Sequence, residues 1–357
     1  MTHDWLLVET LGDEPAVVAD GVRTKNLIPV ATYLRRHPHL MPIQTAIGET
    51  VRAKGPLSSL TPKNDRVICT EVVQMTDGYI HGVQLWVGSP SETPPPRPEV
   101  GPQIWDLAAG VAIDTPESLR IIGWDPHAPA HGRPFAGGLS TRHVTRREAD
   151  TLSMIINPEE GRAICDTWEV NDYRGERITV GFVTRFVPEL LPDGAQHVIC
   201  RGMSWRSVRE SPTIQEDLLA QRILNSLAEP GVYRALVDPR HWTLLKWLGD
   251  PLPFIDWRAQ IVGERAFHPD DLPTVQALTA QFGLAPVSGV LRMVAPDGGW
   301  VAAHMTVQSV ELDTGIYAAL VSWRLPTPDE LAAAGIAGRE SLNPRKSRSR
   351  KEKSAKH

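Results

Sequence analysis

Three tryptophans at matching intervals are the feature that most constrains the fold of this chain. Trp86, Trp205 and Trp323 each close an extended apolar run, and they lie 119 and 118 residues apart. An Asp-Gly pair lies upstream of each tryptophan, the first being Asp77-Gly78. Such a pair between apolar runs is a strong hairpin signal, because glycine adopts positive φ at little steric cost. The spacing therefore predicts three copies of one unit that contains a hairpin.

The second and third copies match each other most closely. Their turns are Asp193-Gly194 and Asp297-Gly298, and both copies carry the triplet Ser-Trp-Arg, at 204–206 and at 322–324. The length of 357 residues accommodates three such units. A unit of about 100 residues buries roughly 60% or more of its unfolded surface, so each unit can hold its own core.

Composition and charge are those of an ordinary soluble protein except at the carboxyl end. The chain is 41% apolar and 22% charged, which is typical of a folded domain. Residues 339–357 contain eight Lys or Arg and two Glu, which gives this segment a local charge of +6. Because the whole chain has a net charge of −5, residues 1–338 together carry a net charge of −11. An acidic body repels polyanions, so nucleic-acid binding by the folded part is not expected. The basic tail is expected to be disordered, and a weak contact with an anionic membrane or with RNA stays open beside a solubilising role.

Cysteine usage and the amino terminus indicate the compartment. Cys69, Cys165 and Cys200 are far apart and form no CxxC pair, which favours reduced thiols over a disulfide framework or a zinc cage. The amino-terminal residues lack the basic and apolar segments of a signal peptide, and no apolar run reaches the length of a membrane span. These features predict a cytoplasmic protein.

Residue patterns divide the chain into three sheet domains with two connections. The proline-rich stretch from Ser89 to Pro98 is expected to be an extended spacer. Further on, Ser211 as a cap and Pro212 in the first turn predict a connector helix from Ser211 to Leu227, which either only packs on its neighbours or pairs subunits and transmits a signal. The expected boundaries are 1–90 for the first domain, 91–102 for the linker, 103–210 for the second domain, 211–229 for the connector helix, 230–327 for the third domain and 338–357 for the tail.

Several elements are expected inside these domains from periodicity. In the first domain, Leu27 to Leu34 places apolar residues on one helical face. In the second, a strand is expected at Leu119 to Trp124 and a helix at Arg146 to Ile156. In the third, strands are expected at Trp242 to Leu248 and at Phe254 to Arg258.

The third domain combines a helix start at His268-Pro269-Asp270-Asp271 with a hairpin from Arg292 to Trp300 and two closing strands. In these features it resembles a PAS domain. Over residues 1–330 the chain resembles a family of mycobacterial and other actinobacterial PAS-GAF-PAS tridomain proteins, with PAS-like first and third domains and a GAF-like second domain. This resemblance implies an α+β fold of three tandem domains, each an antiparallel sheet with helices on one face.

The resemblance implies a role in sensing or in protein interaction rather than one chemistry. PAS and GAF domains bind haem, flavin, cyclic nucleotides, fatty acids or nothing, and a fold alone does not choose among these. The cofactor therefore stays unknown. The expected partners are an unidentified protein or a small apolar ligand, and a homodimer stays open.

The chain carries no signature of the common enzyme classes, so we expect a non-catalytic sensor or scaffold. The segment Gly202-Met203-Ser204-Trp205-Arg206 approaches a nucleophile elbow, but arginine stands where the second glycine is required. Walker A, GxGxxG and HExxH motifs are absent.

The rival hypothesis is an enzyme whose site assembles between the second and third domains. Asp125, His127 and His131 are its candidates as a local cluster of metal-ligand types, with solvated loop side chains as the alternative.

Three residues of the third domain are candidates for lining a ligand pocket. Strand alternation places Met305 on one face of its strand with Val301, Ala303 and Val307, while Met293 lies across the hairpin and Phe267 leads into the helix. The same pattern fits ordinary core residues, although flexible methionines allow a pocket to open.

His268 is the candidate for a haem ligand, but its place before Pro269 at a helix start favours a capping role. The cysteine signature of flavin-adduct PAS domains is absent.

Overall fold

The structure is a computed structural model of the chain, and it describes residues 4–107, 110–125, 127, 133–134, 146–190, 196–208, 226, 228–257, 266–283 and 285–336. Contacts group the chain into two compact units. The first unit comprises Met1–Leu107, Ala112–Arg133 and Pro158–Thr213, and the second comprises Ala108–Val111, Pro134–Asn157 and Ile214–His357.

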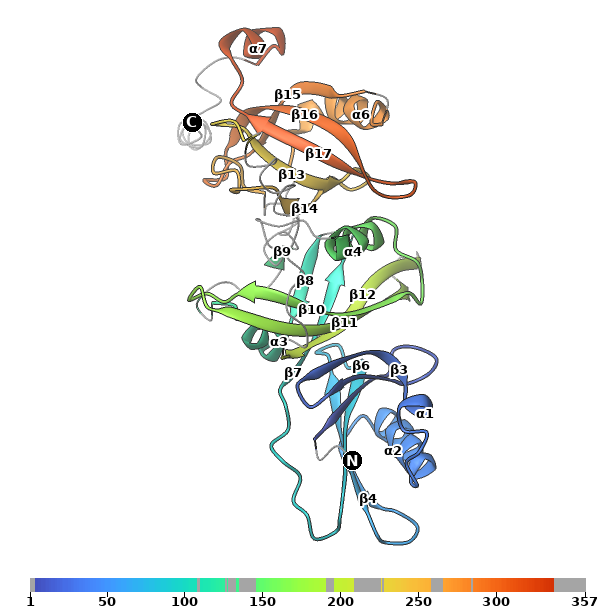
Figure 1. The fold of residues 1–357 in the computed structure, drawn as a ribbon. Helices are drawn as coiled ribbons and strands as arrows, with labels where there is room; N and C mark the ends of the chain where they lie inside the picture. Colours follow the sequence, from blue (N-terminus) through green and yellow to red (C-terminus); the bar gives the residue numbers. More distant parts are fainter. Residues whose placement is uncertain are drawn as a thin grey trace, which may run out of the picture. The chain divides into compact units, whose positions relative to one another are not determined.

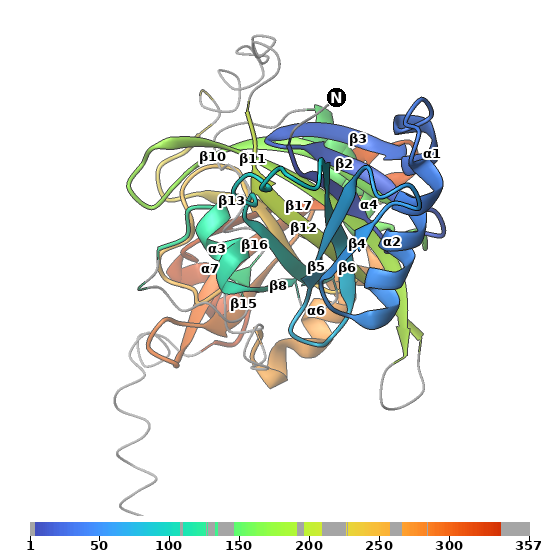
Figure 2. The same cartoon turned by 90° about the horizontal axis from the view of Figure 1, so that it is seen from below.

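The first sheet has six antiparallel strands in the order β3-β2-β1-β6-β5-β4. Its strands are β1 (Leu6–Glu9), β2 (Ala16–Asp20), β3 (Arg23–Pro29), β4 (Leu57–Leu60), β5 (Val67–Gln74) and β6 (Ile80–Gly88). Two helices, α1 (Val30–Tyr33) and α2 (Leu40–Ala53), lie on the same side of this sheet in Figure 1 and again in Figure 2. Helix α2 buries Ile43, Ala46 and Ile47 against Val83 and Leu85 of β6. This contact closes the core of the first domain.

The second sheet also has six strands, in the order β10-β11-β12-β7-β8-β9. Its strands are β7 (Val100–Asp106), β8 (Val111–Asp114), β9 (Arg133–Pro134), β10 (Ala163–Asn171), β11 (Arg177–Leu190) and β12 (Gln196–Arg206). Helix α3 (Pro116–Ile121) packs on β7 and β12. The approach is close, because a side chain at Gly101 of β7 would collide with the backbone of Ser118.

The third sheet has five strands in the order β14-β13-β17-β16-β15. Its strands are β13 (Tyr233–Asp238), β14 (Thr243–Trp247), β15 (Val287–Val294), β16 (Trp300–Asp313) and β17 (Ile316–Arg324). The short 3-10 turn η3 (Pro269–Asp271) leads into α6 (Leu272–Ala280), and α7 (Pro328–Ala333) follows β17. Helix α6 buries Val275 and Leu278 in the same core as Met305 of β16.

The three sheets share one strand order, which confirms the expected α+β fold of three antiparallel sheet domains. When β3 and β9 are left out and the remaining five strands of each domain are numbered in chain order, the strands run second, first, fifth, fourth, third across every sheet. The first and second sheets add one strand, β3 or β9, next to the second strand of this order. The fifth strand is central each time, and it carries Trp86, Trp205 or Trp323. The tryptophan spacing therefore reports a repeated architecture.

The predicted hairpin turns are confirmed where the structure describes them. Gly78 joins β5 to β6 with φ of 86°, and Gly298 joins β15 to β16 with φ of 78°. Side chains other than glycine rarely adopt such angles. The remaining turn, Asp193-Gly194 of the second domain, lies outside the described residues, but β11 and β12 pair antiparallel on either side of it.

Three expected elements are wrong in type or extent. The strand expected at Leu119 to Trp124 is in part helix α3, because Thr115 caps a helix start by accepting a hydrogen bond from the Ser118 N–H and Pro116 fits the first turn. The strand expected at Phe254 to Arg258 is absent over residues 254–257, which follow two prolines and form a turn. The helix expected from Leu27 begins only at Val30, since Leu27 belongs to β3.

Helix α4 (Arg146–Ile156) confirms the helix expected there, and it contacts β16 and β17 within the second unit. Its residues from Thr151 to Ile156 are all buried. Almost all of the expected connector helix and the whole basic tail lie outside the described residues. Among the helices that the structure describes, none is long and apolar enough to cross a membrane.

Candidate functional site

Two tryptophans meet in the core of the third domain, and we call Trp247 and Trp323 the indole pair. They lie on the same face of the sheet, on either side of β13, where Ala235 pairs with Trp247 and Tyr233 pairs with Trp323. Their ring centroids are 5.6 Å apart at an interplanar angle of 52°. Trp247 is only 2% exposed and Trp323 6%. The small side chain of Ala235 leaves the space above β13 to the two rings.

Neither indole N–H of the pair has a hydrogen-bond acceptor in the described part of the chain. An indole nitrogen donates and never accepts. Most buried polar side-chain atoms in proteins are paired, and an unpaired buried donor costs about 1–3 kcal/mol. Two buried indoles in contact, each with an N–H that lacks an acceptor among the described residues, therefore make this core a candidate for binding an acceptor.

The sequence-predicted pocket residues all lie in this core. Met305 is fully buried and pairs directly with Trp323 across β16 and β17. Met293 is buried on β15, and Phe267 forms an isolated antiparallel bridge with it. The structure places Phe267, Met293 and Met305 in one hydrophobic core cluster, and whether they line a ligand site stays a prediction. The indole pair was missed as a donor site, although five of the eleven tryptophans of the chain lie between residues 242 and 323.

His268 caps a helical turn, as expected from its place before Pro269. Its Nδ1 accepts a hydrogen bond from the Asp270 backbone N–H at 3.2 Å, and its ring packs edge-on against Trp300. The neighbouring Asp271 accepts hydrogen bonds from the backbone N–H, Nε and Nη2 of Arg292 at 2.7, 3.1 and 2.7 Å. Burial alone would raise the pKa of Asp271, but these bonds from Arg292 outweigh it and lower the pKa. This ion pair ties the start of α6 to β15.

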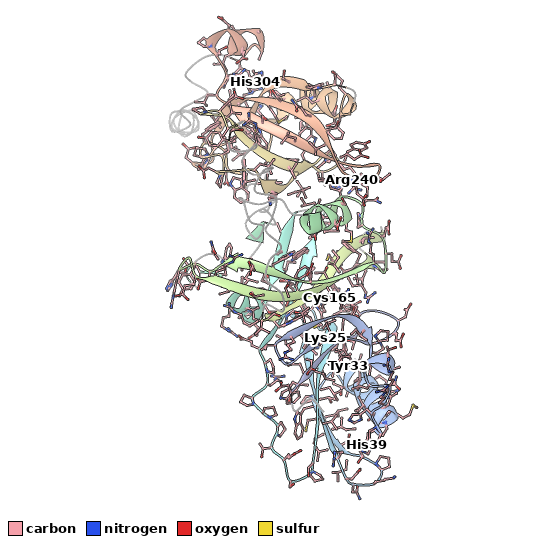
Figure 3. The ribbon with its side chains drawn as sticks, in the orientation of Figure 1. Lys25, Tyr33, His39, Cys165, Arg240 and His304 are labelled. Carbon is pink, nitrogen blue, oxygen red and sulfur yellow. The ribbon has the colours of Figure 1, made fainter. Side chains whose placement is uncertain are left out.

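Cys165 and Cys200 are thiols held in their protonated form. Burial raises the pKa of each to about 12. The Sγ of Cys165 donates to the backbone carbonyl of Lys25 at 3.0 Å, and Figure 3 shows these two residues near each other. Because the thiolate is the reactive form of cysteine, neither thiol is suited to nucleophilic chemistry.

The structure brings only part of the rival metal cluster into view. The carboxylate of Asp125 accepts a hydrogen bond from the backbone N–H of His127 at 2.9 Å, which is a local turn contact. His131 lies outside the described residues. Among the residues that are described, no group of three or more His, Cys, Asp and Glu side chains is arranged to hold a metal ion.

A charged cluster built around two buried side chains, Arg201 and His81, joins the first and second domains within the first unit. Arg201 on β12 is 2% exposed, and its guanidinium lies 2.7 Å from Asp77 and 3.0 Å from Glu189. It also stacks over the ring of Tyr79, with its Cζ 4.1 Å from the centroid, and lies 3.4 Å from Nε2 of His81. Sequence reasoning missed this cluster, which connects residues more than a hundred positions apart.

His81 sits in this cluster as a neutral imidazole. Its Nδ1 lies 2.8 Å from the carbonyl oxygen of Gly202, which only accepts, so Nδ1 carries the proton and Nε2 accepts from Arg201. Burial lowers the pKa of His81 to about 4, and the positive charge of Arg201 adds to this effect.

A second ion pair crosses the same joint. Glu9 of β1 is 1% exposed and accepts hydrogen bonds from Nε and Nη2 of Arg185 on β11 at 2.8 and 3.1 Å. Apolar residues from both domains, including Leu7, Met203 and Trp205, pack in a common cluster beside it. The charged side chains of both clusters have protein partners, so we interpret the clusters as structural contacts between the first two domains rather than as binding sites.

Comparison with known proteins covers all three domains. Residues 4–96 match the description "Rv3651-like, N-terminal", residues 99–207 the Rv3651-like middle domain, and residues 217–334 the Rv3651-like C-terminal domain. The crystal structure of an uncharacterised protein from Mycobacterium tuberculosis is 47% identical, covers 94% of this chain and 100% of its own, and superposes with a TM-score of 0.86. No curated protein matches the chain.

Two other solved structures are far more distant. An RNA-binding light-oxygen-voltage receptor is 9% identical, with a TM-score of 0.23 over 63% of this chain and 95% of that one. The periplasmic sensory domain of the Campylobacter jejuni chemoreceptor Tlp1 is 13% identical, with a TM-score of 0.21 over 66% of this chain and 74% of that one. Similarities this weak transfer neither a ligand nor an activity. The three domain matches and the close mycobacterial relative confirm the resemblance to a mycobacterial three-domain family: the chain belongs to the Rv3651-like family.

Proposed function

We propose that this chain is a non-catalytic cytoplasmic sensory module that binds a small molecule in the core of its third domain. The observation that carries the proposal is the indole pair, Trp247 and Trp323, whose two buried N–H groups lack acceptors among the residues that the structure describes. A core that only had to be stable would hold apolar rings at this position at lower cost, because phenylalanine buries no donor. A bound molecule that accepts these hydrogen bonds gives the two tryptophans a role.

Several other buried polar groups have protein partners, although Nε1 of Trp205 on β12 also lacks an acceptor among the described residues. Arg201 and Glu9 are buried charges with protein partners at hydrogen-bonding distance. His81 is held neutral at a pKa of about 4, far from the value near 7 that suits a general base. The three cysteines are free thiols, which fits a reducing compartment. In this proposal these groups serve structure, and the third domain serves recognition.

The first unit is proposed to act as a rigid platform in signalling. Removing one partner of a buried ion pair is strongly destabilising, so Glu9 with Arg185 resists separation of the first two domains. The buried Arg201 with the partly exposed Asp77 adds to this resistance. A domain pair that moves as one body is suited to presenting a fixed surface. The receiver of the signal in this proposal is an unidentified protein partner.

Native mass spectrometry of the purified full-length chain tests the proposal. The expected result is a mass above that of the polypeptide, which falls to the polypeptide mass after denaturation and releases a small molecule for identification. A chain that carries no small molecule and instead forms a stable complex with a protein partner would favour a scaffold without ligand sensing.

The rival enzyme hypothesis has its own test. Replacing Asp125, His127 and His131 together by alanine removes the candidate cluster of metal-ligand types. The proposal expects the variant to fold and to retain the bound molecule. A turnover measured in the wild-type chain that disappears in the folded variant would favour the enzyme.

A further inference from the structure

We propose that the ligand of the third domain is a neutral, mainly apolar molecule that presents a hydrogen-bond acceptor, such as a carbonyl or ether oxygen, to the indole N–H groups of Trp247 and Trp323. This inference rests on the proposed function and adds the chemical class of the ligand to it.

The donors define the polar end of the ligand. Both indole nitrogens are donors only, so the complementary ligand atom must accept. The ring centroids of Trp247 and Trp323 are 5.6 Å apart, and a carbonyl or ether oxygen carries lone pairs that can accept from an indole N–H. Ligands whose polar atoms only donate, such as ammonium groups, would leave the pair unsatisfied.

The positions of the charged side chains in the third domain indicate that its ligand carries no net charge. Its buried charged side chains, within the described residues, are Asp238, Lys246 and Asp271. Asp238 lies 2.9 Å from His241, and Asp271 lies 2.7 Å from Arg292, so both carboxylates are already paired. Lys246 pairs in register with Leu236, one position away from Ala235, so it is on the opposite face of the sheet from the indole pair. An ion in the core would therefore lack a counter-charge, which is costly.

The surrounding side chains define an apolar body. Met293 and Met305 offer flexible thioether chains that adapt to a bound shape. Ala303 and Ala319 are fully buried and small. Next to Met305 in register stands Gly289, where an added Cβ would lie 3.6 Å from Thr274 and 4.0 Å from Leu278 of α6, which is ordinary contact. The helix thus stands clear of this strand by at least the width of a methyl group.

A third tryptophan of the same domain provides a matched control. The indole N–H of Trp242 donates to Thr279 Oγ1 at 3.0 Å, so its hydrogen bond is already made. Trp242 also packs edge-on against Phe267 at 5.9 Å between centroids. Trp242→Phe therefore removes an indole donor from the same core without touching the indole pair.

The test compares matched probes on the full-length chain. 1-Indanone and indane share a bicyclic shape, but only the ketone carries an acceptor; 9-fluorenone and fluorene form a larger pair with the same difference. Affinities are measured together with the indole N–H resonances of the ¹⁵N-labelled chain, which single Trp→Phe variants assign. We expect one ketone to bind about fivefold more tightly than its hydrocarbon, in line with one net hydrogen bond, and to shift the resonances of Trp247 and Trp323.

The variants identify the donors. Trp247→Phe and Trp323→Phe, made singly, should each reduce the preference for the ketone, whereas Trp242→Phe should leave it unchanged. Where one single variant fails to fold, the other variant and the wild-type resonances decide. Equal binding of ketone and hydrocarbon in both pairs, or absence of ketone binding, would overturn the inference. A molecule retained in native mass spectra despite that result would leave the proposed function standing and reject only this ligand class.

Discussion

His81 and Arg201 share one buried contact, in which Nη1 of Arg201 lies 3.4 Å from Nε2 of His81 and both side chains are no more than 2% exposed. The arginine always carries its proton, so it donates and the imidazole accepts. The contact therefore requires a neutral histidine. Protonating His81 would place two cations together in the joint between the first and second domains.

The joint is predicted to weaken in mild acid. The pKa of His81 falls from its ordinary value of 6.5 to about 4 in the folded chain, chiefly because of burial. Between these values the unfolded chain takes up a proton that the folded chain excludes, so the full stability is present above pH 6.5 and is lost as the pH falls towards 4. A shift of this size corresponds to about 3 kcal/mol at most.

His81→Gln provides the comparison for this prediction, because glutamine can donate to Gly202 and accept from Arg201 without titrating. Denaturant unfolding across this pH range should show a steeper loss for the wild-type chain than for the variant. His304, whose pKa burial also lowers, contributes equally to both proteins. Parallel profiles for the two proteins would show that His81 does not carry the effect.

The second ion pair of the joint is predicted to matter for stability. Glu9→Gln leaves the guanidinium of Arg185 partly buried without its counter-charge, and we expect a loss of about 3 kcal/mol in the free energy of unfolding. Glu99→Gln is the control, because Glu99 pairs with Arg120 at the exposed surface and such pairs contribute less than about 1 kcal/mol. Equal small effects of both substitutions, measured by denaturant unfolding, would contradict a buried structural role for Glu9.

The pair of Asp271 and Arg292 is predicted to anchor the start of α6. Asp271→Asn weakens three hydrogen bonds to Arg292, and bonds to charged groups contribute about 1.5–3 kcal/mol. The neighbouring Asp270 is a matched control, since it is 74% exposed and 3.6 Å from Arg292. Asp270→Asn should change the unfolding free energy by less than about 1 kcal/mol. The reverse order of the two effects would refute this assignment.

Thiol reactivity is predicted to separate the three cysteines. Burial raises the pKa of Cys165 and Cys200 to about 12, so neither forms appreciable thiolate in mildly alkaline buffer. Only Cys69 should react readily with a disulfide reagent in the folded chain, and Cys69→Ala should abolish that rapid reaction. Unfolding should expose all three thiols. Rapid modification of two or three thiols in the native protein would disagree with the packing around β10 and β12.

The sequence reveals the repeated unit because hairpins depend on local chemistry. Asp77-Gly78 and Asp297-Gly298 turn the chain where expected, since the turn needs only glycine at positive φ. Helix α3 was missed although Thr115 and Pro116 mark its start, because the apolar residues that follow also fit a strand. Local signals therefore identify turns more securely than they separate a short helix from a short strand.

Long-range contacts are less predictable. The triplets around Trp205 and Trp323 are identical, yet Trp323 faces the core beside α6 and Trp205 packs in the cluster shared with the first domain. A shift of one residue in the pairing register moves every side chain of a strand to the opposite face of the sheet. The Ser-Trp-Arg triplet alone therefore does not determine which face of the sheet its tryptophan takes. Glu9 and Arg185 are 176 positions apart, and the local sequence around either residue does not predict that the two form an ion pair.

The most direct test of the central claim is a high-resolution crystal structure of the purified full-length chain. We predict a non-protein, non-water molecule in the core of the third domain, with an acceptor atom about 2.7–3.2 Å from Nε1 of Trp247 or Trp323. A core in which both indole nitrogens donate to protein atoms or to a single ordered water would contradict the claim.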